Sequence, residues 1–175
     1  MALPIPIPPN GLENDIICCM ERALTLTDYQ SLAELRYQIR CFLHFSKQAA
    51  RVAGLEPQQH QFILSLKGLP RNMRPRIGEL AERLQVRHHS AVELVNRLSI
   101  GGYVRRHRGG EDSREVLLSL TPKGEKVLKK LSLQHRAELR MRGPALLTAL
   151  RRVLQTSKSG KGVRSLAASR ARRKT

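Results

Sequence analysis

The feature that most constrains the fold is a change of hydrophobic period at Gly101-Gly102. Before these glycines lie two segments with helical spacing, GELAERL at 78–84 and a segment that begins near His88. In the second segment apolar residues recur at Ala91, Leu94, Val95 and Leu98. After the glycines, residues 103–108 and 115–120 have strand-like composition and flank the glycine-bearing loop GGEDS. This order predicts a helix-turn-helix followed by a two-stranded β wing.

Further helices are predicted before this motif. Thr27 and Gln30 have the spacing of a capping box, and a stripe of apolar or small residues follows as far as Gly54. The stripe alternates steps of three and four residues at Leu32, Leu35, Ile39, Phe42, Ser46, Ala49 and Ala53. One long helix is therefore expected, and such a stripe needs a partner helix. Pro57 suits the first turn of another helix, which Gly68 is expected to end.

A helix is also predicted after the wing. Thr121-Pro122 has the cap-then-proline pattern of a helix start, and helical spacing continues to about Met141. Gly143-Pro144 is expected to break this helix before a last helix from Ala145 to Leu154. The predicted fold class is mainly α with a small two- or three-stranded β wing, that is, a winged helix-turn-helix with N- and C-terminal dimerisation helices.

Prolines and charges divide the chain into three regions. Residues 1–26 comprise an arm with four prolines before position 10 and a short helix from Leu12. Residues 27–155 form the folded domain, whose lobe at about 56–120 carries the helix-turn-helix and the wing. Residues 156–175 hold seven basic residues and no acidic one, so a disordered basic tail is expected.

The composition points to a polyanionic partner. Lys and Arg number 32 against 14 Asp and Glu, which gives a net charge of +18. Three Phe, three Tyr and no Trp are too few for the aromatic platforms on which RNA bases stack, so DNA is favoured over RNA.

No stretch approaches the ~20 apolar residues that span a bilayer, and no membrane association is predicted. The N-terminus lacks the pattern of a secretory signal, and three cysteines cannot pair completely, so a reducing, cytoplasmic location is expected.

Four blocks make the sequence resemble a known family over roughly residues 28–155. They are GELAERLQV at 78–86, LVNRL at 94–98, GYVRR at 102–106, and the wing segment DSR at 112–114 with VLLSLTPKG at 116–124. These blocks resemble the MarR (multiple antibiotic resistance regulator) family of winged helix-turn-helix transcription factors. This chain has Arg87 where many members have a small capping residue, and Asn96 where they have an acid.

The resemblance implies a homodimer that binds a palindromic DNA operator. Two-fold symmetry would place the half-sites one helical turn apart, ~34 Å along the axis. The expected function is that of a sequence-specific transcriptional regulator, a repressor released by a small molecule or an oxidant. The alternative is an architectural, nucleoid-type protein that binds DNA through charge with little sequence specificity.

The adjacent residues His88 and His89 stand at the leading edge of the predicted recognition helix. Adjacent side chains on a helix diverge by about 100°, which disfavours a shared metal ion, and a solvated surface pair is the simpler alternative. Contact with DNA is the preferred interpretation, because the first turn of a recognition helix faces base edges and phosphates. The other residues expected to contact DNA from this helix are Arg87, Ser90, Glu93 and Arg97.

In the wing, Arg108, Asp112 and Arg114 resemble the family pattern in which an arginine enters the minor groove and an acid orients it. A plain hairpin turn is the alternative, because Asp and Gly also suit tight turns. Glu111 and Asp112 lie in an exposed turn without the burial that shifts a carboxyl pKa, so they do not indicate catalysis. No phosphate loop, Cys-x-x-Cys motif or catalytic triad is recognised, and the chain is not expected to be an enzyme or to carry a cofactor or metal.

Two further features concern the signal, a small molecule or an oxidant, that would release the regulator from DNA. By resemblance, an effector pocket would lie between the long helix and the DNA-binding lobe, lined by Phe42, Phe45 and His60. Cys41 lies beside Arg40, whose charge would favour a thiolate, and some family members sense oxidants through a cysteine near the dimer helices. A buried, inert cysteine is the alternative for Cys41.

Overall fold

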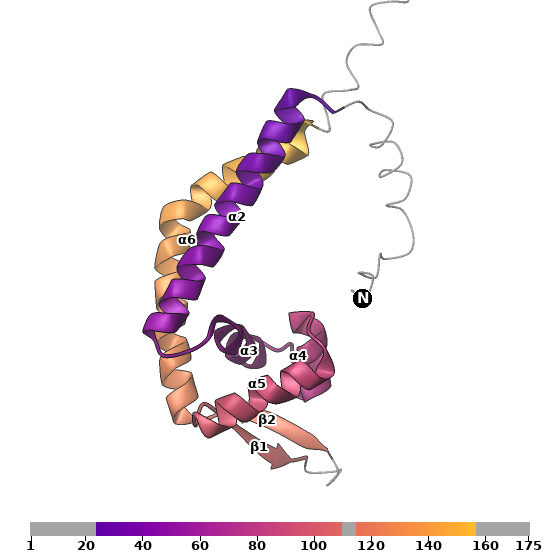
Figure 1. Ribbon diagram of the computed structural model, residues 1–175, viewed down its shortest axis with the longest axis vertical. Coiled ribbons are helices and arrows are strands. Elements are labelled where there is room, and N and C mark those ends of the chain that lie inside the picture. The colour runs from indigo at the N-terminus through magenta and orange to yellow at the C-terminus, as the bar shows by residue number, and fades with distance from the viewer. Residues whose placement is uncertain (1–23, 110–114, 157–175) are drawn as a thin grey trace, which may run out of the picture. The chain divides into compact units, whose positions relative to one another are not determined.

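The backbone of the computed structural model is mainly helical, and it describes residues 24–109 and 115–156. The helices are α2 (Leu26–Val52), α3 (Pro57–Lys67), α4 (Ile77–Leu84), α5 (His88–Ile100) and α6 (Pro122–Thr156). The strands are β1 (Val104–Arg108) and β2 (Val116–Leu120), as Figure 1 shows. The predicted winged-helix fold class is therefore confirmed. The expected N-terminal arm and the expected basic tail lie outside the described residues.

The chain divides into two compact units. One contains residues up to Ile39 together with those from Pro144 onward, and the other runs from Arg40 to Gly143. The second unit holds a continuous hydrophobic core to which α3, α4, α5, both strands and α6 contribute. The most deeply buried of its large apolar side chains are Phe62, Ile63, Leu80, Leu98, Leu118 and Leu131. With so few aromatic residues in the chain, aliphatic side chains supply most of this core.

The helix-turn-helix is formed by α4 and α5. The four residues that the apolar spacing selects on α5, namely Ala91, Leu94, Val95 and Leu98, are all buried. Leu80 and Ala81 of α4 pack in the same core. The turn between the helices begins at Gln85, which has a left-handed conformation with φ 54°, and the Val86 amide donates to the Ala81 carbonyl. The expected start of α5 at His88 and its end at Gly101 are both observed.

The wing is an antiparallel pair of strands. Its register runs from Val104 opposite Leu120 to Arg108 opposite Val116. At the open end of the ladder, the Gly109 amide donates to the Glu115 carbonyl at 2.9 Å. On the other edge of β2, the Leu118 amide donates to the Pro75 carbonyl, so the loop before α4 is hydrogen-bonded to the wing.

The first turn of α6 packs closely on the turn that follows α5. The Thr121 hydroxyl accepts a hydrogen bond from the Gly124 amide and donates one to the Gly102 carbonyl. The Thr121 amide donates to the Tyr103 carbonyl at 3.0 Å. A Cβ at Gly124 would overlap that carbonyl oxygen, so this position requires glycine.

Two predicted helix boundaries are wrong. The capping box is formed by Thr25 and Asp28 rather than Thr27 and Gln30: the Asp28 amide donates to Thr25 Oγ1, and the Thr25 amide donates to Asp28 Oδ2. Asp is an equally good partner in such a pair, because its carboxylate accepts the cap amide and complements the helix dipole.

The expected break at Gly143-Pro144 is absent, and α6 continues through Pro144. Proline usually clashes with the Cβ of the residue before it when that residue is helical, and Gly143 has no Cβ. Gly143 therefore removes one part of the steric penalty at Pro144, although the helix still loses the backbone hydrogen bond that the Pro144 nitrogen cannot donate.

The contact at Gly124 predicts a large loss of stability on substitution. Gly124→Ala should lower the free energy of unfolding by about 1–3 kcal/mol, because α6 or the Tyr103 backbone must move. Denaturant unfolding followed by circular dichroism measures this change. Gly78→Ala in α4 is the matched control: a Cβ there meets nothing within 4 Å, so stability should be unchanged or slightly raised. Equal effects of the two substitutions would contradict the contact.

Candidate nucleic-acid interface

The exposed side of α5 is polar. Arg87, His88, His89, Glu93 and Arg97 are all exposed, whereas Ser90 is half-buried. Arg87 occupies the N-cap position with φ −67° and ψ 148°, and its side chain makes no capping hydrogen bond. Its guanidinium is thus not engaged in closing the helix, and the side chains expected to contact DNA from α5 lie on one exposed end and side of the helix.

Two polar contacts involve the middle of this helix. Arg97 Nη2 lies 3.7 Å from Glu93 Oε2, one helical turn away. Asn96 Oδ1 accepts a hydrogen bond of 2.6 Å from Arg106 Nη2, which belongs to β1. Asn96 and Arg106 were missed as site residues from the sequence, because nothing in the spacing of residues ten apart indicates that they touch.

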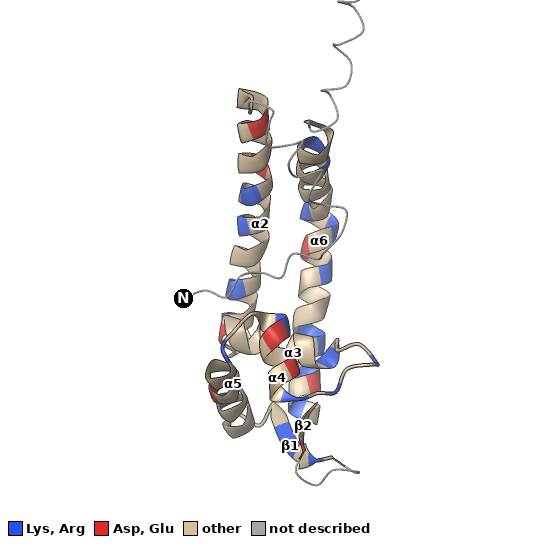
Figure 2. Cartoon of the chain, turned by 90° about the vertical axis from the view of Figure 1, so that its right-hand side faces the viewer, with Lys and Arg blue, Asp and Glu red and all other residues tan. Residues whose placement is uncertain are grey.

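Strand β1 is strongly basic. Arg105, Arg106, His107 and Arg108 are all exposed, and Arg105 Nε donates to Ser119 Oγ at 2.9 Å. Figure 2 shows basic residues on β1 and along α6. Of the predicted wing residues, Arg108 is described and exposed, whereas Asp112 and Arg114 lie outside the described residues.

A nearly buried carboxylate holds the base of the wing. Glu115 is 9 % exposed and accepts hydrogen bonds from Arg76 Nε and, at 2.7 Å, from Arg74 Nη1. The Arg76 hydrogen bond, followed by the effects of Arg74, holds the pKa of Glu115 below its usual value. The carboxylate therefore remains charged and ties the loop before α4 to the strand β2, which places α5 and the wing in a fixed relation.

The three residues predicted for an effector pocket surround a histidine that the sequence did not single out. The ring of His135 lies 5.9 Å from Phe42, 5.5 Å from Phe45 and 4.8 Å from His60. His135 Nδ1 is 2.7 Å from the Leu131 carbonyl. A carbonyl only accepts, so Nδ1 carries the proton.

The other nitrogen of His135, Nε2, lies 2.9 Å from the hydroxyl of Ser46. When His135 is neutral, this Nε2 accepts a hydrogen bond from Ser46. His60 is only 2 % exposed, and its Nδ1 has no hydrogen-bond partner among the described residues. The cluster is thus an aromatic, half-buried site with one unsatisfied acceptor or donor at His60.

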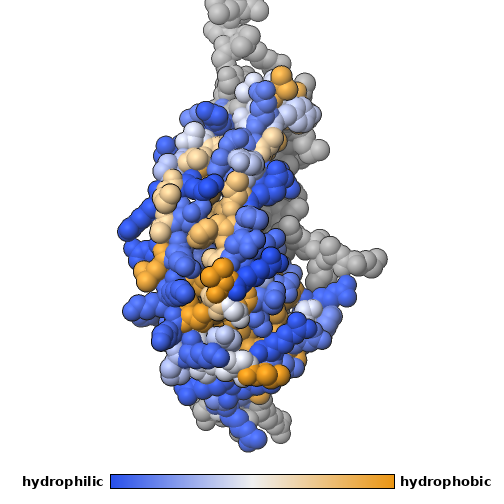
Figure 3. Space-filling model, turned by 60° about the vertical axis from the view of Figure 1, so that its left-hand side comes forward, coloured by the Kyte–Doolittle hydropathy of each residue, from blue (hydrophilic) through white to orange (hydrophobic). Residues whose placement is uncertain are grey.

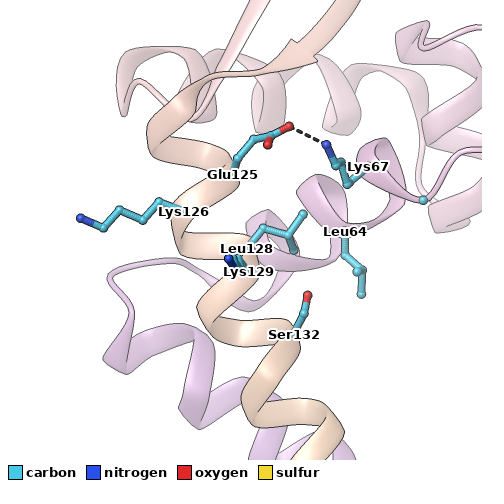
Figure 4. Close-up of a pocket in the computed structure, with 8 residues that line it drawn as sticks. Leu64, Lys67, Glu125, Lys126, Leu128, Lys129 and Ser132 are labelled. Atoms are coloured by element: carbon cyan, nitrogen blue, oxygen red, sulfur yellow. Dashed lines mark hydrogen bonds and ion pairs between the residues drawn. The ribbon is translucent and has the colours of Figure 1, made fainter.

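An open groove of about 570 Å³ lies elsewhere in this unit, between α3 and α6. Its apolar lining includes Leu64 and Leu128, and lysines line it together with Ser132 (Figure 4). Lys67 Nζ pairs with Glu125 Oε1 at 2.6 Å at its edge. None of Phe42, Phe45 and His60 lines this groove, so the predicted pocket and the observed groove are different places.

Cys41 is half-buried and makes no disulfide. In residues 24–109 and 115–156, no three His, Cys, Asp or Glu side chains gather in a way that would hold a metal ion. Over the same residues, no helix combines the length and the apolar composition needed to cross a bilayer.

Comparison with known proteins agrees with this architecture. Residues 53–115 match the sequence model of the MarR family. No curated protein matches the chain in sequence. AbsC, a MarR family transcriptional regulator from Streptomyces coelicolor, is a structural neighbour with a TM-score of 0.61 and 22 % identity, over 77 % of this chain and 94 % of that one.

Two other solved structures are similar. A MarR family transcription regulator superposes with a TM-score of 0.61 and 18 % identity, over 84 % of this chain and 91 % of its own. A variant of MepR from S. aureus, bound to an oligodeoxyribonucleotide, superposes with a TM-score of 0.54 and 16 % identity. That match covers 77 % of this chain and 99 % of MepR. At these identities the structures establish the fold.

Burial of His60 predicts a specific pH dependence of stability. Desolvation, followed by repulsion from His135, lowers the pKa of His60 to about 4 in the folded chain, against 6.5 when it is exposed. The unfolded chain therefore binds more protons between these values. Stability should be greatest above pH 6.5 and fall as the pH drops towards 4, by up to about 1.4 kcal/mol per pH unit from this residue.

Denaturant unfolding of the wild type and His60→Gln between pH 4 and 8 checks this dependence. The variant should lose the extra fall in unfolding free energy below pH 6.5. His44→Gln, which replaces an exposed histidine of α2, should keep it. Parallel stability curves for the wild type and His60→Gln would show that His60 titrates normally.

Proposed function

We infer that this chain, whose residues 53–115 match the MarR family, is a transcription regulator that binds duplex DNA. The observation that carries this inference is the arrangement of α4, α5 and the wing: a buried apolar side fixes α5 in the core while its polar side is exposed beside a basic hairpin. A major groove about 12 Å wide admits an α-helix, and its base edges present a distinct pattern for each base pair.

The N-terminal turn of α5 is the part that we assign to base contacts. His88 and His89 are exposed there and have no hydrogen-bond or ion-pair partner among the described residues. The uncapped start of the helix also offers backbone amides to phosphate. Ser90, Glu93 and Arg97 follow on the same helix, and Arg87 precedes it. The sequence-based assignment of these residues to DNA contact thus remains our proposal.

The wing is assigned to the adjacent minor groove. Arg108 is exposed at the end of β1 that leads into the wing tip. Narrow minor grooves have enhanced negative potential and attract arginine. Arg114 at the wing tip, oriented by Asp112, is proposed to enter the groove on the strength of the family pattern alone.

We propose that two copies of the chain form the functional unit. In the unit that contains the start of α2 and the end of α6, large apolar side chains are at least 40 % exposed: Leu24, Leu26, Tyr29, Leu32, Tyr37, Ile39, Leu147, Leu150 and Leu154. Figure 3 shows apolar side chains interspersed with hydrophilic ones on the face that it presents. A second copy would cover such residues, and its two-fold axis would present two α5 helices to a palindromic operator.

The regulator is proposed to act as a repressor that a small molecule or an oxidant releases. The aromatic cluster around His135 and the groove beside Leu64 each offer an apolar surface to a small molecule. Half-buried Cys41 is the proposed oxidant-sensitive group. Repeating the binding measurements below with aromatic acids and with peroxide tests both forms of release.

The assignment of α5 to base contacts predicts the effect of removing its histidines. The wild-type chain should enrich a palindromic sequence from a random duplex library, and His88→Ala/His89→Ala should bind that sequence about ten-fold more weakly or worse. Footprinting and fluorescence anisotropy measure the two effects. His44→Ala, which removes an exposed histidine from α2, is the control and should bind normally.

Three outcomes separate the hypotheses. Unchanged footprints for the double variant would contradict the base contacts. Binding without any sequence enrichment would favour a charge-only architectural protein, because specific proteins exceed their non-specific affinity by ~10³ to 10⁷. Absence of binding to any duplex at low salt would overturn the proposed function altogether.

Dimerisation through the exposed apolar residues predicts that a charge among them dissociates the dimer. Leu32→Glu should shift the chain from dimer to monomer in analytical ultracentrifugation, because burying an unpaired carboxylate at an interface is costly. Leu64→Glu is a matched control on α3, since its side chain is 41 % exposed and that of Leu32 is 42 %. A Leu32→Glu variant that stays dimeric would place the interface elsewhere.

A further inference from the structure

The middle of α5 is joined to the wing by a hydrogen bond between two exposed side chains. Arg106 Nη2 of β1 donates to Asn96 Oδ1 of α5 at 2.6 Å. A guanidinium presents its donors in a rigid planar fork, so a short bond at one nitrogen restricts the direction in which the others point. Asn96 therefore orients the head group of Arg106 at the surface.

The position of this pair relates it to the proposed DNA-facing side of α5. His89, Glu93 and Asn96 follow one another at steps of four and three, which places them on one side of the helix, and all three are exposed. Side chains alternate along a strand, so Arg106 and Arg105 project from opposite faces of the wing. Arg106 projects towards α5, whereas Arg105 bonds to Ser119 across the hairpin.

The charge of Arg106 is not neutralised by this contact. Asn96 is an amide, so it holds the guanidinium without a compensating negative charge. The neighbouring Arg97 differs, because the carboxylate of Glu93 lies 3.7 Å from its guanidinium. Arg106 is thus an oriented cation with its full charge available to another anion.

The geometry points to Arg106 as a phosphate-binding residue that Asn96 positions on the sugar–phosphate strand between the two grooves. In a B-form duplex, one such strand separates any major groove from the minor groove next to it. If α5 lies in one groove and the wing in the next, this sugar–phosphate strand runs between them. A side chain that bridges α5 and β1 then lies against the strand. This inference rests on the proposed function, in which α5 occupies the major groove and the wing the minor groove.

The salt dependence of binding tests the inference. Each phosphate neutralised by a protein cation contributes about −0.9 to the slope of log Kobs against log salt concentration. Arg106→Ala should therefore make the slope shallower by about 0.9 for each protomer bound to the selected duplex, as measured by fluorescence anisotropy between about 50 and 200 mM salt. Arg105→Ala removes the same charge from the other face of β1 and should leave the slope unchanged.

Two substitutions of Asn96 separate charge from position. Asn96→Asp keeps the hydrogen bond to Arg106 but adds a carboxylate that neutralises the charge of the guanidinium. The slope should therefore become shallower, as in Arg106→Ala, while the melting temperature is retained or raised. Asn96→Ala keeps the charge and removes the support, so the affinity should fall with little change in slope. A merely structural pair would lower the melting temperature in Arg106→Ala and Asn96→Ala without moving either slope.

The outcomes distinguish this inference from the function on which it rests. If the wild type binds its selected duplex and Arg106→Ala leaves the slope unchanged, the phosphate contact is wrong and the proposed function stands. Equal reductions in Arg105→Ala and Arg106→Ala would also overturn the inference, because they would show a diffuse charge effect. If the wild type selects no duplex, the proposed function itself has failed.

Discussion

The helix-turn-helix and the wing depend on the close approach of α6 to the turn after α5. That turn ends one helix at Gly101 and starts strand β1 at Val104, so a single contact there constrains the recognition helix, the wing and the long C-terminal helix. Gly124 permits the approach because it has no Cβ, and Thr121 supplies the hydrogen bonds that hold it. Lys123 adds a hydrogen bond to the Gly101 carbonyl and lies over the ring of Tyr103. These contacts explain why threonine, lysine and glycine occupy positions 121, 123 and 124 of the segment TPKG.

The few acidic residues near the helix-turn-helix and the wing determine which of the many cations there are paired. Glu115 is buried at the base of the wing and pairs with two arginines from the loop before α4, so those cations serve the fold. Arg97 is close to Glu93 on the surface, where an exposed pair contributes little to stability. Arg106 is held by a neutral amide and keeps its charge for a partner. The placement of a few carboxylates therefore separates the cations that stabilise the fold from those that we propose to contact DNA.

Much of the fold could be predicted from local patterns. Apolar spacing identified the buried side of α5, and the glycines and the Thr-Pro pair located the ends of α5 and the start of α6, because these signals act over one or two turns. The continuation of α6 through Pro144 was mispredicted, because the sequence-based rule treated Gly143-Pro144 as a helix break, whereas Gly143 lacks the Cβ that adds to the restriction on the residue before a proline. The Thr25–Asp28 cap was missed in favour of Thr27–Gln30 because two overlapping candidates satisfied the same spacing.

The candidate site was less accessible to sequence reasoning. His88, His89 and Arg87 are found at the expected start of α5, but their contact with DNA remains a proposal. Phe42, Phe45 and His60 do gather in space, yet the histidine at their centre, His135, is 75 positions from His60 and carried no signal of its own. Asn96 and Arg106 were likewise separate until the wing folded beside the helix.

The sequence by itself determined the order of elements, the apolar sides of the helices and the basic character of the chain, because these depend on residues within a few positions of each other. Only the tertiary structure decided which polar groups meet. Arg106 reaches Asn96, and Glu115 reaches Arg74 and Arg76, through the packing of β1 and β2 against the helix-turn-helix. Whether a given arginine stabilises the fold or keeps its charge for a binding partner depends on these tertiary contacts. Local residue spacing does not encode them, because the partners are far apart in the sequence.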